Sequence, residues 1–336
     1  MVMMSGGVDS SVAAAMLVDA GYDVTGVTLK LWGGPSDSGC CAVSDVEDAR
    51  RVAAQLGIPH YVFNFSDEFE DRVVRPYVDA YAHGRTPNPC VECNRTMKWG
   101  RLLERALRLG FDAVATGHHA RIVATPDGLA VARGVDRAKD QSYVCYMLDA
   151  VQLARTLFPV GAITKAEVRD HAARLGLRTA SKRESMDVCF ITRGGREAFL
   201  GARIARRAGH IVTSDGRVVG RHGGVDAFTI GQRRGLGVAL GERRYVVDID
   251  AERASVTVGT RDELMRREVR LSDARWRGDR APRGEVLVQT RAHGEPVPAR
   301  VEGDIVRIVR PIARVARGQV VVCYDGDIVL GGGTAA

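Results

Sequence analysis

Ser5-Gly6-Gly7-Val8-Asp9-Ser10-Ser11 lies between the apolar residues Met1–Met4 and a run with strong helix propensity, residues 12–18. The order strand, glycine turn, helix is typical of a phosphate-binding site. Glycines let the backbone approach an anion closely, and the start of a helix offers free N–H groups at the positive end of its dipole. Serine hydroxyls add donors, and Asp9 can hold Mg²⁺ against the phosphates. The chain has no Gly-x4-Gly-Lys-Ser/Thr, which excludes a Walker-type kinase or GTPase loop.

Length and composition describe a soluble protein with more than one domain. The chain has 336 residues, enough for two or three domains, and 45% of them are hydrophobic. No run approaches the ~20 apolar residues of a membrane helix, and no basic-then-apolar signal pattern opens the sequence. The seven cysteines are scattered and do not form a disulfide framework. We therefore predict a cytoplasmic protein with reduced thiols and no membrane association.

The net charge of +7 comes entirely from the last part of the chain. Residues 1–200 hold 24 basic and 24 acidic residues, whereas residues 201–336 hold 24 arginines and 17 acidic residues. Arginine suits phosphate recognition, so this basic region predicts a polyanionic partner such as nucleic acid. A general preference for arginine over lysine along the whole chain is the alternative explanation.

Strands alternate with helices over the first 200 residues. The expected strands are 24–31, 60–64 and 113–116, and the expected helices are 44–57, which opens on a Ser-x-x-Glu capping box at Ser44, 68–82, 102–109 and 164–176. This alternation predicts a parallel sheet covered by helices, with ligands beyond the carboxyl ends of its strands. Leu29 and Gly117-His118-His119 follow strands, so we expect them near the opening loop.

Beyond residue 200, short strands between Asp-Gly and Gly-rich turns replace this pattern. The expected strands are 211–212, 217–219, 245–247 and 255–258, and from residue 269 onward 285–291, 304–309 and 319–324, spaced as in a small barrel. We therefore predict an α/β catalytic domain over residues 1–200, a small β-rich central domain over 201–262 and a C-terminal β-barrel over 263–336.

Cysteines are the second informative feature. In Pro87-Asn88-Pro89-Cys90-Val91-Glu92-Cys93-Asn94 two prolines precede a helix, and Cys93 lies near its start, where a thiol ionises readily. Cys-x-x-Cys alone fits zinc, disulfide exchange and iron–sulfur ligation, and a structural zinc would need two more ligands. Cys189 is the best candidate for a third functional thiol, with a buried strand cysteine as the alternative. The other cysteines are Cys145 and Cys323, expected in the core, and Cys40 and Cys41, which have no assignment.

The opening loop resembles the pyrophosphate loop (PP-loop) of the N-type ATP pyrophosphatases, enzymes that activate an oxygen by adenylation. Further segments make the whole chain resemble one family among them, the tRNA-uridine 2-sulfurtransferases or tRNA-specific 2-thiouridylases. These segments are Gly84–Pro89, Cys93-Asn94, Ala115–His118, Lys139–Tyr143, Leu157–Gly161, Cys189–Ile191, Gly231–Gly237 and Leu330–Gly333. They are ordered as in the family and span nearly the full length.

The resemblance implies an ATP-dependent 2-thiolation of the wobble uridine of tRNA of the Lys, Glu and Gln types. Uridine O2 would be adenylated, and sulfur would then replace the activated oxygen, with release of AMP and pyrophosphate. ATP and Mg²⁺ would bind at Ser5, Gly6, Gly7, Val8, Asp9, Ser10 and Ser11, with Leu29 and Gly117. Cys189 would carry a persulfide, and Cys93 would help to release its sulfur. The implied partners are tRNA and a sulfur donor, which is a cysteine desulfurase, a sulfur-relay protein or sulfide.

The resemblance also implies contacts with tRNA. These are Asn88, Pro89 and Cys90 around the target base, and His118, Lys139, Asp140, Gln141, Arg291 and Gln319 elsewhere. Arg291 is followed by Ala292, where relatives often have an aromatic residue. A wobble base must leave the anticodon stack to reach a buried thiol, so base extrusion is expected.

Cys90 departs from the family pattern, because many relatives have aspartate there. Cys90, Cys93 and Cys189 together could hold a [4Fe–4S] cluster that leaves one iron free to bind sulfide. Cys189 would then be a ligand and carry no persulfide. The sequence leaves both versions open.

Two other classes of protein remain. A related ATP pyrophosphatase acting on a small molecule, such as an amidating or amino-acid-joining synthetase, would need neither the cysteines nor the basic last part. A tRNA-binding or iron–sulfur-carrying protein that has lost catalysis is disfavoured by the intact opening loop. Separately, four residues are short for a central strand, so we expect the native chain to begin a few residues earlier.

Overall fold

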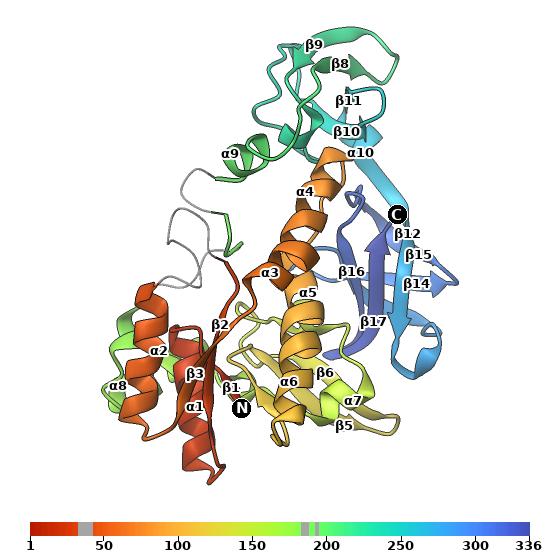
Figure 1. The fold of residues 1–336 in the computed structure, drawn as a ribbon. Coiled ribbons are helices and arrows are strands. Elements are labelled where there is room, and N and C mark those ends of the chain that lie inside the picture. The colour runs from red at the N-terminus through yellow and green to blue at the C-terminus, as the bar shows by residue number, and fades with distance from the viewer. Residues whose placement is uncertain (33–42, 183–187, 192–194) are drawn as a thin grey trace. The chain divides into compact units, whose positions relative to one another are not determined.

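A computed structural model describes residues 1–32, 43–182, 188–191 and 195–336 (Figure 1). The chain divides into two compact units. The first comprises Met1–Val73, Pro89–Thr192 and Asp327–Val329, and the second comprises Val74–Asn88, Arg193–Gly326 and Leu330–Ala336. Cys40 and Cys41 lie outside the described residues, as do residues 183–187, which precede Cys189.

A five-stranded parallel sheet organises the first unit. Its strands, in spatial order, are β3 (His60–Asn64), β2 (Gly26–Lys30), β1 (Val2–Met3), β4 (Val114–Ala115) and β7 (Thr156–Leu157). Val2 lies opposite Gly26 of β2 and Ala115 of β4, so the short opening strand is the central one. The predicted parallel α/β sheet is confirmed.

Helices flank this sheet along the chain. They are α1 (Val8–Asp19), α2 (Val43–Gln55), α3 (Ser66–Phe69), η1 (Glu70–Val74), α5 (Pro89–Glu92), η2 (Cys93–Leu102), α6 (Leu103–Arg108), η3 (Ser142–Cys145), α7 (Ala150–Ala154), η4 (Pro159–Ala162), α8 (Lys165–Arg174) and η5 (Arg178–Ser181). One expectation was wrong at a helix start. Because α2 already begins at Val43, Ser44 lies inside its first turn and is not the cap. The helix expected over 102–109 is confirmed as α6, and the helix expected to start near Cys93 is confirmed as the π-helical η2, which follows α5 directly.

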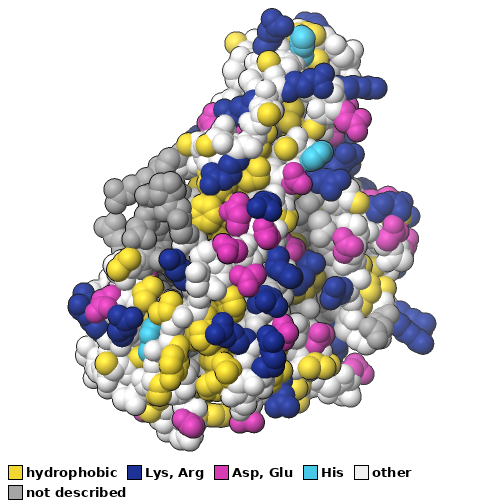
Figure 2. Space-filling model, in the orientation of Figure 1, with side chains coloured by type: hydrophobic (Ala, Val, Ile, Leu, Met, Phe, Trp, Pro, Cys, Tyr) yellow, Lys and Arg dark blue, Asp and Glu magenta, His cyan; other side chains and the backbone are white. Residues whose placement is uncertain are grey.

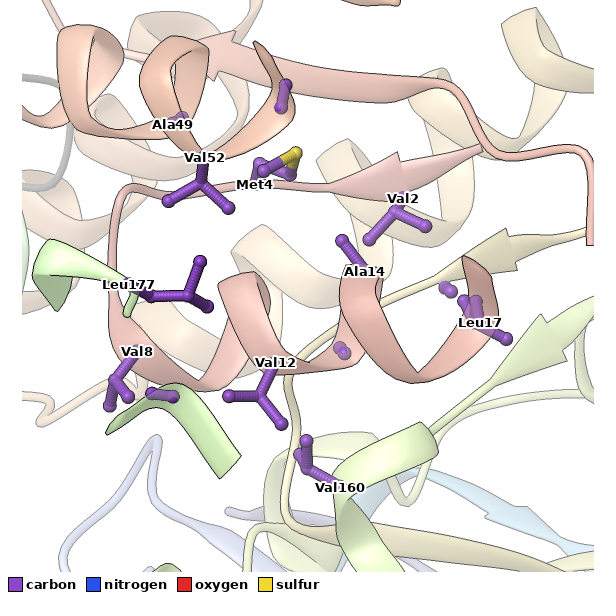
Figure 3. Packing of buried hydrophobic residues seen from close by; sticks show 14 of the residues in the cluster. Val2, Met4, Val8, Val12, Ala14, Leu17, Ala49, Val52, Val160 and Leu177 are labelled. Carbon is purple, nitrogen blue, oxygen red and sulfur yellow. The ribbon is translucent and has the colours of Figure 1, made fainter. Parts of the chain in front are cut away.

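The core around α1 consists mostly of valine and alanine side chains (Figure 3). Val12 and Ala14 are completely buried and pack in one cluster with Met4, which follows β1, and with Val52 of α2. Full burial of a valine side chain contributes roughly 1.5–3 kcal/mol. This packing fixes both ends of the glycine loop, because the loop joins β1 directly to α1.

A hairpin also belongs to the first unit. It consists of β5 (Ala120–Thr125) and β6 (Gly128–Arg133), and Ala132 of β6 pairs with Ile328 from the short segment 327–329. The sequence analysis did not predict this hairpin.

The second unit contains a four-stranded sheet that confirms the strands expected after residue 200. Its order is β10 (Tyr245–Asp250), β11 (Ser255–Gly259), β8 (Gly209–Thr213) and β9 (Val218–His222). A separate core of Ile211, Phe228, Val246 and Val256 packs beneath it. The short helices α4 (Arg75–Ala82), α9 (Gly195–Gly201), η6 (Val225–Ala227) and α10 (Arg261–Leu264) complete this part.

A closed six-stranded antiparallel barrel forms the end of the chain. Its strands are β12 (Met265–Trp276), β15 (Ile305–Ala313), β14 (Val297–Glu302), β13 (Glu285–Gln289), β16 (Val320–Asp325) and β17 (Ile328–Ala335), and β12 pairs with β17 to close the ring. The barrel prediction is confirmed, although β14 and β17 were not foreseen. Among the described helices, none combines the length and apolarity that a bilayer span requires.

Candidate active site

The glycine loop is held by its own serines. Gly7 is the N-cap of α1 and has no side chain that could accept a hydrogen bond from the N–H groups of the first turn. The hydroxyls of Ser10 and Ser11 instead donate to the carbonyl of Gly7 at 3.1 and 2.8 Å, and the backbone N–H of Ser5 donates to Ser10 Oγ at 3.2 Å. The first N–H groups of a helix have no partner within it, so this turn presents donors at the positive end of the α1 dipole.

Two glycines permit close backbone approaches at the loop. Gly6 has φ +72°, and a Cβ there would lie 2.2 Å from the carbonyl oxygen of Asp45 in α2. A Cβ on Gly117, which follows β4, would lie 2.6 Å from the backbone nitrogen of Ser10. The loop, the start of α2 and the segment after β4 are therefore in direct contact, as their positions after parallel strands predict. Leu29, by contrast, lies within β2 and is buried.

Asp9, in the first turn of α1, forms hydrogen bonds with the side chains of Lys165 and His119. Lys165 Nζ lies 2.7 Å from Asp9 Oδ1 and 2.6 Å from Oδ2, and His119 Nε2 lies 3.0 Å from Oδ1. Burial alone would raise the pKa of Asp9, but the hydrogen bonds from His119 and Lys165 outweigh it and hold the pKa below its ordinary value. The carboxylate therefore stays charged at neutral pH beside the loop.

A second lysine clamps the other side of the loop. Lys182 Nζ donates to the carbonyl of Gly6 at 2.9 Å, to Asp45 Oδ1 at 2.7 Å and to Asp48 Oδ2 at 2.6 Å. Arg178 adds a contact to Asp48, with Nε 3.1 Å from Oδ1. These charges balance, so the network ties α2 and the end of η5 to the glycine loop without leaving a net charge.

The sequence analysis missed the roles of Lys165 and Lys182. Lys165 was recognised only as part of a helix start, and Thr164 and Glu167 do form a capping box there. The position of Lys165 was the available signal, because this lysine is the first residue of a capped helix that follows the last parallel strand. No local pattern marks Lys182.

The candidate catalytic cysteines lie in the first unit and form no disulfide among the described residues. Cys93, the first residue of the π-helical η2, is buried, whereas Cys90 in α5 and Cys189 are half-buried. No three His, Cys, Asp or Glu side chains converge as metal ligands in the part of the chain that the structure describes. Cys90, Cys93 and Cys189 are therefore not brought together as the ligands of a [4Fe–4S] cluster in this arrangement.

Cys145 and Cys323 lie in the core, as predicted. Both are completely buried free thiols. Burial raises the pKa of Cys323 to about 12 and raises the pKa of Cys145 further. Neither thiol is poised for chemistry.

His118 sits in an aromatic cluster. Its ring centroid lies 5.4 Å from that of Trp99 and 5.8 Å from that of Phe158, and its Nδ1 lies 2.6 Å from the hydroxyl of Thr116. Burial lowers the pKa of His118 well below its ordinary value, and Lys98, with Nζ 3.4 Å from Nε2, adds to the effect. His118 is therefore neutral at pH 7.

Asp140 organises the segment that follows β6. Its buried carboxylate accepts hydrogen bonds from Arg133 Nη1 at 2.8 Å, from the backbone N–H of Gly134 and from both the N–H and the hydroxyl of Ser142. Gln141 accepts from the backbone N–H of His119 at 2.9 Å. Asp140 and Gln141 therefore position backbone beside the loop. Lys139 is half-buried and Pro89 is buried.

Three predicted tRNA contacts belong to the second unit, namely Asn88, Arg291 and Gln319. Asn88 is half-buried. Gln319 Nε2 donates to the carbonyl of Thr86 at 2.9 Å, and the N–H of Thr86 donates to the carbonyl of Arg317 at 2.7 Å. Gln319 therefore holds the loop that leads to Asn88. Arg291 is exposed, and Gln289 fixes its backbone by donating to its carbonyl at 3.0 Å.

A serine-tied glycine loop between the central parallel strand and a helix defines the catalytic domain of a PP-loop ATP pyrophosphatase. Family models agree along the chain: a tRNA methyl transferase HUP domain matches residues 1–193, a tRNA methyl transferase PRC-barrel domain matches residues 197–260, and an aminomethyltransferase beta-barrel domain matches residues 266–335.

Full-length relatives give the particular family. A tRNA-specific 2-thiouridylase MnmA of Chloroflexus aurantiacus is 49% identical over 350 residues, covering 100% of this chain and 98% of its own. The proteins of the same name from Chloroflexus aggregans and Mycobacterium avium are 50% and 49% identical, covering 100% and 99% of this chain and 98% and 97% of their own. The chain belongs to the tRNA-specific 2-thiouridylase family, whose members are sulfurtransferases.

Solved structures that are similar to part of this chain include an NMN synthetase from Francisella tularensis and a U34-tRNA thiolase NcsA from Methanococcus maripaludis with its [4Fe–4S] cluster. Both are 18% identical, with TM-scores of 0.36 and 0.35. They cover 60% and 53% of this chain, and 71% and 56% of their own chains.

Proposed function

We propose that this enzyme carries out ATP-dependent 2-thiolation of the wobble uridine of tRNA of the Lys, Glu and Gln types. The observation that carries the proposal is the glycine loop, with Lys165 on Asp9 at one side and Lys182 on Gly6 at the other, in a chain of this family. Such a loop is suited to bind a nucleoside triphosphate, whose cleavage would drive the reaction.

Adenylation is the first step that the loop supports. Uridine O2 attacks the α-phosphorus of ATP, and pyrophosphate leaves into the turn formed by Gly6, Gly7 and the start of α1. Backbone N–H groups and Lys165 stabilise the negative charge that develops on the departing phosphates. The poor leaving group, a carbonyl oxygen, becomes a good one, AMP.

Magnesium fits this site only as a partner of the nucleotide. Both oxygens of Asp9 are already engaged by Lys165, so the chain does not offer a free carboxylate there. Mg²⁺ usually binds through few carboxylates together with substrate phosphates. Asp9 would hold Mg²⁺ together with the phosphates of ATP, and the ion would neutralise part of their charge.

Sulfur transfer is assigned to Cys189 and Cys93. Cys189 is half-buried and therefore accessible to a cysteine desulfurase or a sulfur-relay protein, whose own persulfide passes its outer sulfur to the Cys189 thiolate. Sulfide, the third donor, would serve only the cluster route, because it cannot form a persulfide without an oxidant. The persulfide sulfur of Cys189 attacks C2 of the activated uridine and AMP leaves. The thiolate of Cys93 then attacks the sulfur of Cys189, which frees 2-thiouridine and leaves a Cys93–Cys189 disulfide for a thiol reductant to reopen. We derive no step through a cluster.

Recognition of tRNA completes the proposal. We assign the catalytic domain to residues 1–200, a tRNA-contacting central domain to 201–262 and the barrel to 263–336. Asn88, Pro89 and Cys90 would surround the extruded base. His118, Lys139, Asp140, Gln141, Arg291 and Gln319 would contact tRNA or position the loops that do. A cytoplasmic location follows from such a substrate.

The test is anaerobic purification with iron and sulfide analysis, followed by thiolation of an unmodified glutamate-type tRNA with ATP and, in parallel reactions, a cysteine desulfurase with cysteine as the persulfide source or sulfide. Pyrophosphate release is measured separately from thiouridine formation. Cys93→Ser and Cys189→Ser should lose thiolation but keep tRNA-dependent pyrophosphate release, whereas Cys90→Ala and the buried control Cys323→Ser should keep both.

Two results would overturn parts of the proposal. About four irons per chain, lost together with activity in Cys90→Ala, would replace the persulfide route by a cluster route. Pyrophosphate release that is indifferent to tRNA, without thiolation by the wild type, would reassign the enzyme to a small-molecule synthetase.

A further inference from the structure

The segment between η6 and β10 forms an open surface pocket that the reaction at the glycine loop does not use. Its volume is about 520 Å³, and its lining includes Arg233, Arg243 and Arg244 together with Leu236, Val238 and Leu240. We call it the Arg233 pocket. All of these residues lie in the second unit, in the region matched by the PRC-barrel model.

The walls of the Arg233 pocket are fixed by the fold. The N–H of Gly231 donates to the carbonyl of Val246 at 2.8 Å, and the N–H of Val246 donates to the carbonyl of Gln232 at 2.9 Å. The Gln232 side chain spans the turn, accepting from the N–H of Thr229 at 3.0 Å and donating to the carbonyl of Arg234 at 3.0 Å. Leu236 anchors the far side in the core of this sheet.

The pocket is strongly positive for its size. Residues 228–247 hold four arginines and a single acidic residue, Glu242. Arg244 pairs with Glu242 and lies 3.9 Å from Glu263. Arg233 and Arg243 are exposed, and neither has an ion-pair partner among the residues with a described structure. Lys and Arg side chains are prominent on the visible face of the region around β8–β11 (Figure 2).

Backbone donors add to this charge. Gly235 and Gly237 line the pocket and have φ of +70° and +68°, a conformation that glycine adopts without strain. Without side chains at these positions, a ligand can approach the backbone N–H groups directly. Two guanidinium groups beside a glycine turn are suited to a phosphate, which they bind through paired N–H donors.

The size and the apolar wall indicate more than a phosphate. A volume of this order accommodates a nucleotide-sized group. Val238 and Leu240, which are half-buried, offer a surface against which a base or ribose can pack. From these observations we infer that the Arg233 pocket binds one nucleotide of the tRNA strand, with Arg233 and Arg243 on its phosphodiester and with Val238 and Leu240 against its sugar or base. The inference rests on the proposed function for its choice of RNA as the polyanion.

The test compares two double variants of the full chain. Arg233→Ala/Arg243→Ala removes the two unpaired arginines of the pocket. Arg217→Ala/Arg221→Ala is the matched control, because both residues are exposed in the same region and do not line the pocket. Binding of unmodified glutamate-type tRNA is measured between about 50 and 200 mM salt, together with the KM for tRNA and the KM for ATP.

We expect the pocket variant to bind tRNA at least about tenfold more weakly, with the slope of log Kd against log salt reduced by about 1 to 2. Its KM for tRNA should rise, while its KM for ATP, its saturated rate of thiolation and its melting temperature stay at wild-type values. The control variant should match the wild type in all of these.

Three outcomes count against the pocket. If the pocket variant binds tRNA with the affinity and salt slope of the wild type, the inference about the pocket is wrong. This holds even if the wild type thiolates tRNA normally. Equal losses of tRNA affinity in the two double variants would mean that the effect comes from general surface charge and not from the Arg233 pocket. Protection of Arg233 and Arg243 from phenylglyoxal by inorganic phosphate, but not by tRNA, would assign the pocket to a small free anion. Failure of the wild type to thiolate any tRNA would instead count against the proposed function.

Discussion

Lys165 and Asp9 are 156 positions apart in the sequence, yet the lysine Nζ lies within 2.7 Å of both carboxylate oxygens. The side chain of Lys165 is 11% exposed and that of Asp9 is 30% exposed. The pair therefore lies at the edge of the solvent, where a phosphate can reach it. It links α8 to the first turn of α1 and brings a positive charge to the glycine loop.

Lys165→Met should weaken the use of ATP. The substitution leaves Asp9 with His119 as its remaining partner in the described site and removes a charge that faces the departing phosphates. We expect the KM for ATP to rise at least about tenfold and the free energy of unfolding to fall by about 1–3 kcal/mol. Steady-state kinetics of pyrophosphate release and urea unfolding measure the two effects. Lys165→Arg, which keeps the charge, is the control, and a wild-type KM in Lys165→Met would contradict the assignment.

Gly6→Ala should destabilise the protein by more than the strain of its positive φ, because the new Cβ would also clash with backbone. Gly6 and Gly21 have φ of +72° and +80°, but only at Gly6 would a Cβ strike backbone, the carbonyl of Asp45 at 2.2 Å. Gly21→Ala has open space around it and should cost about 1–2 kcal/mol from strain alone.

Urea unfolding of the two alanine variants separates the clash from the strain. Gly6→Ala should lose clearly more stability than Gly21→Ala, and it alone should impair ATP-dependent pyrophosphate release. Equal losses would mean that α2 shifts to make room, and that the close contact has no role in shaping the site.

His118 should make the protein less stable in mild acid. Unfolded histidine binds a proton near pH 6.5, whereas the folded site resists protonation because His118 is buried beside Lys98. The unfolded state therefore binds more protons below pH 6.5, and the free energy of unfolding falls there by up to about 1.4 kcal/mol per pH unit until the lowered pKa is reached. Above pH 6.5 this effect is absent.

His118→Phe should flatten this dependence, because phenylalanine can pack against Trp99 and Phe158 without titrating. Urea unfolding at pH 7.5 and pH 5.5 measures the change, with the exposed His210→Gln as control. An unchanged difference between the two pH values in His118→Phe would show that other groups cause the acid effect. His60 and His222, whose pKa values burial also lowers, would be the next to test.

Native thiols should react in the order of their exposure. Cys90 and Cys189 are half-buried, whereas Cys145 and Cys323 are completely buried with raised pKa values, about 12 for Cys323. Alkylation by iodoacetamide at pH 8, followed by peptide mass spectrometry, should modify the first pair at least about tenfold faster because thiolate is the reactive form. Unfolding in urea should abolish the difference. Rapid labelling of Cys145 in the native protein would contradict the described core.

Much of the fold could be read from the sequence because its signals are local. The β-branched stretches that became β2 and β3 alternate with helices at short range, and Ser5–Ser11 carries its turn and helix start within seven residues. The helices expected near Cys93 and over 102–109 were found as η2 and α6, but the sequence did not show that residues 89–108 are helical without a break, because the π-helical η2 has no recognisable sequence period. The capping box at Ser44 failed because α2 already starts at Val43.

The sequence by itself determined the class of the loop, the parallel α/β domain, the barrel and the thiols worth testing, since these depend on residue types within a few positions of one another. Only the tertiary structure decided which charges meet at the loop. Lys165 on Asp9 and Lys182 on Gly6 come from segments more than 150 residues away along the chain. The burial of α1 against β1, α2 and α8 brings those segments to the loop, and a single sequence holds no local trace of a contact made by packing.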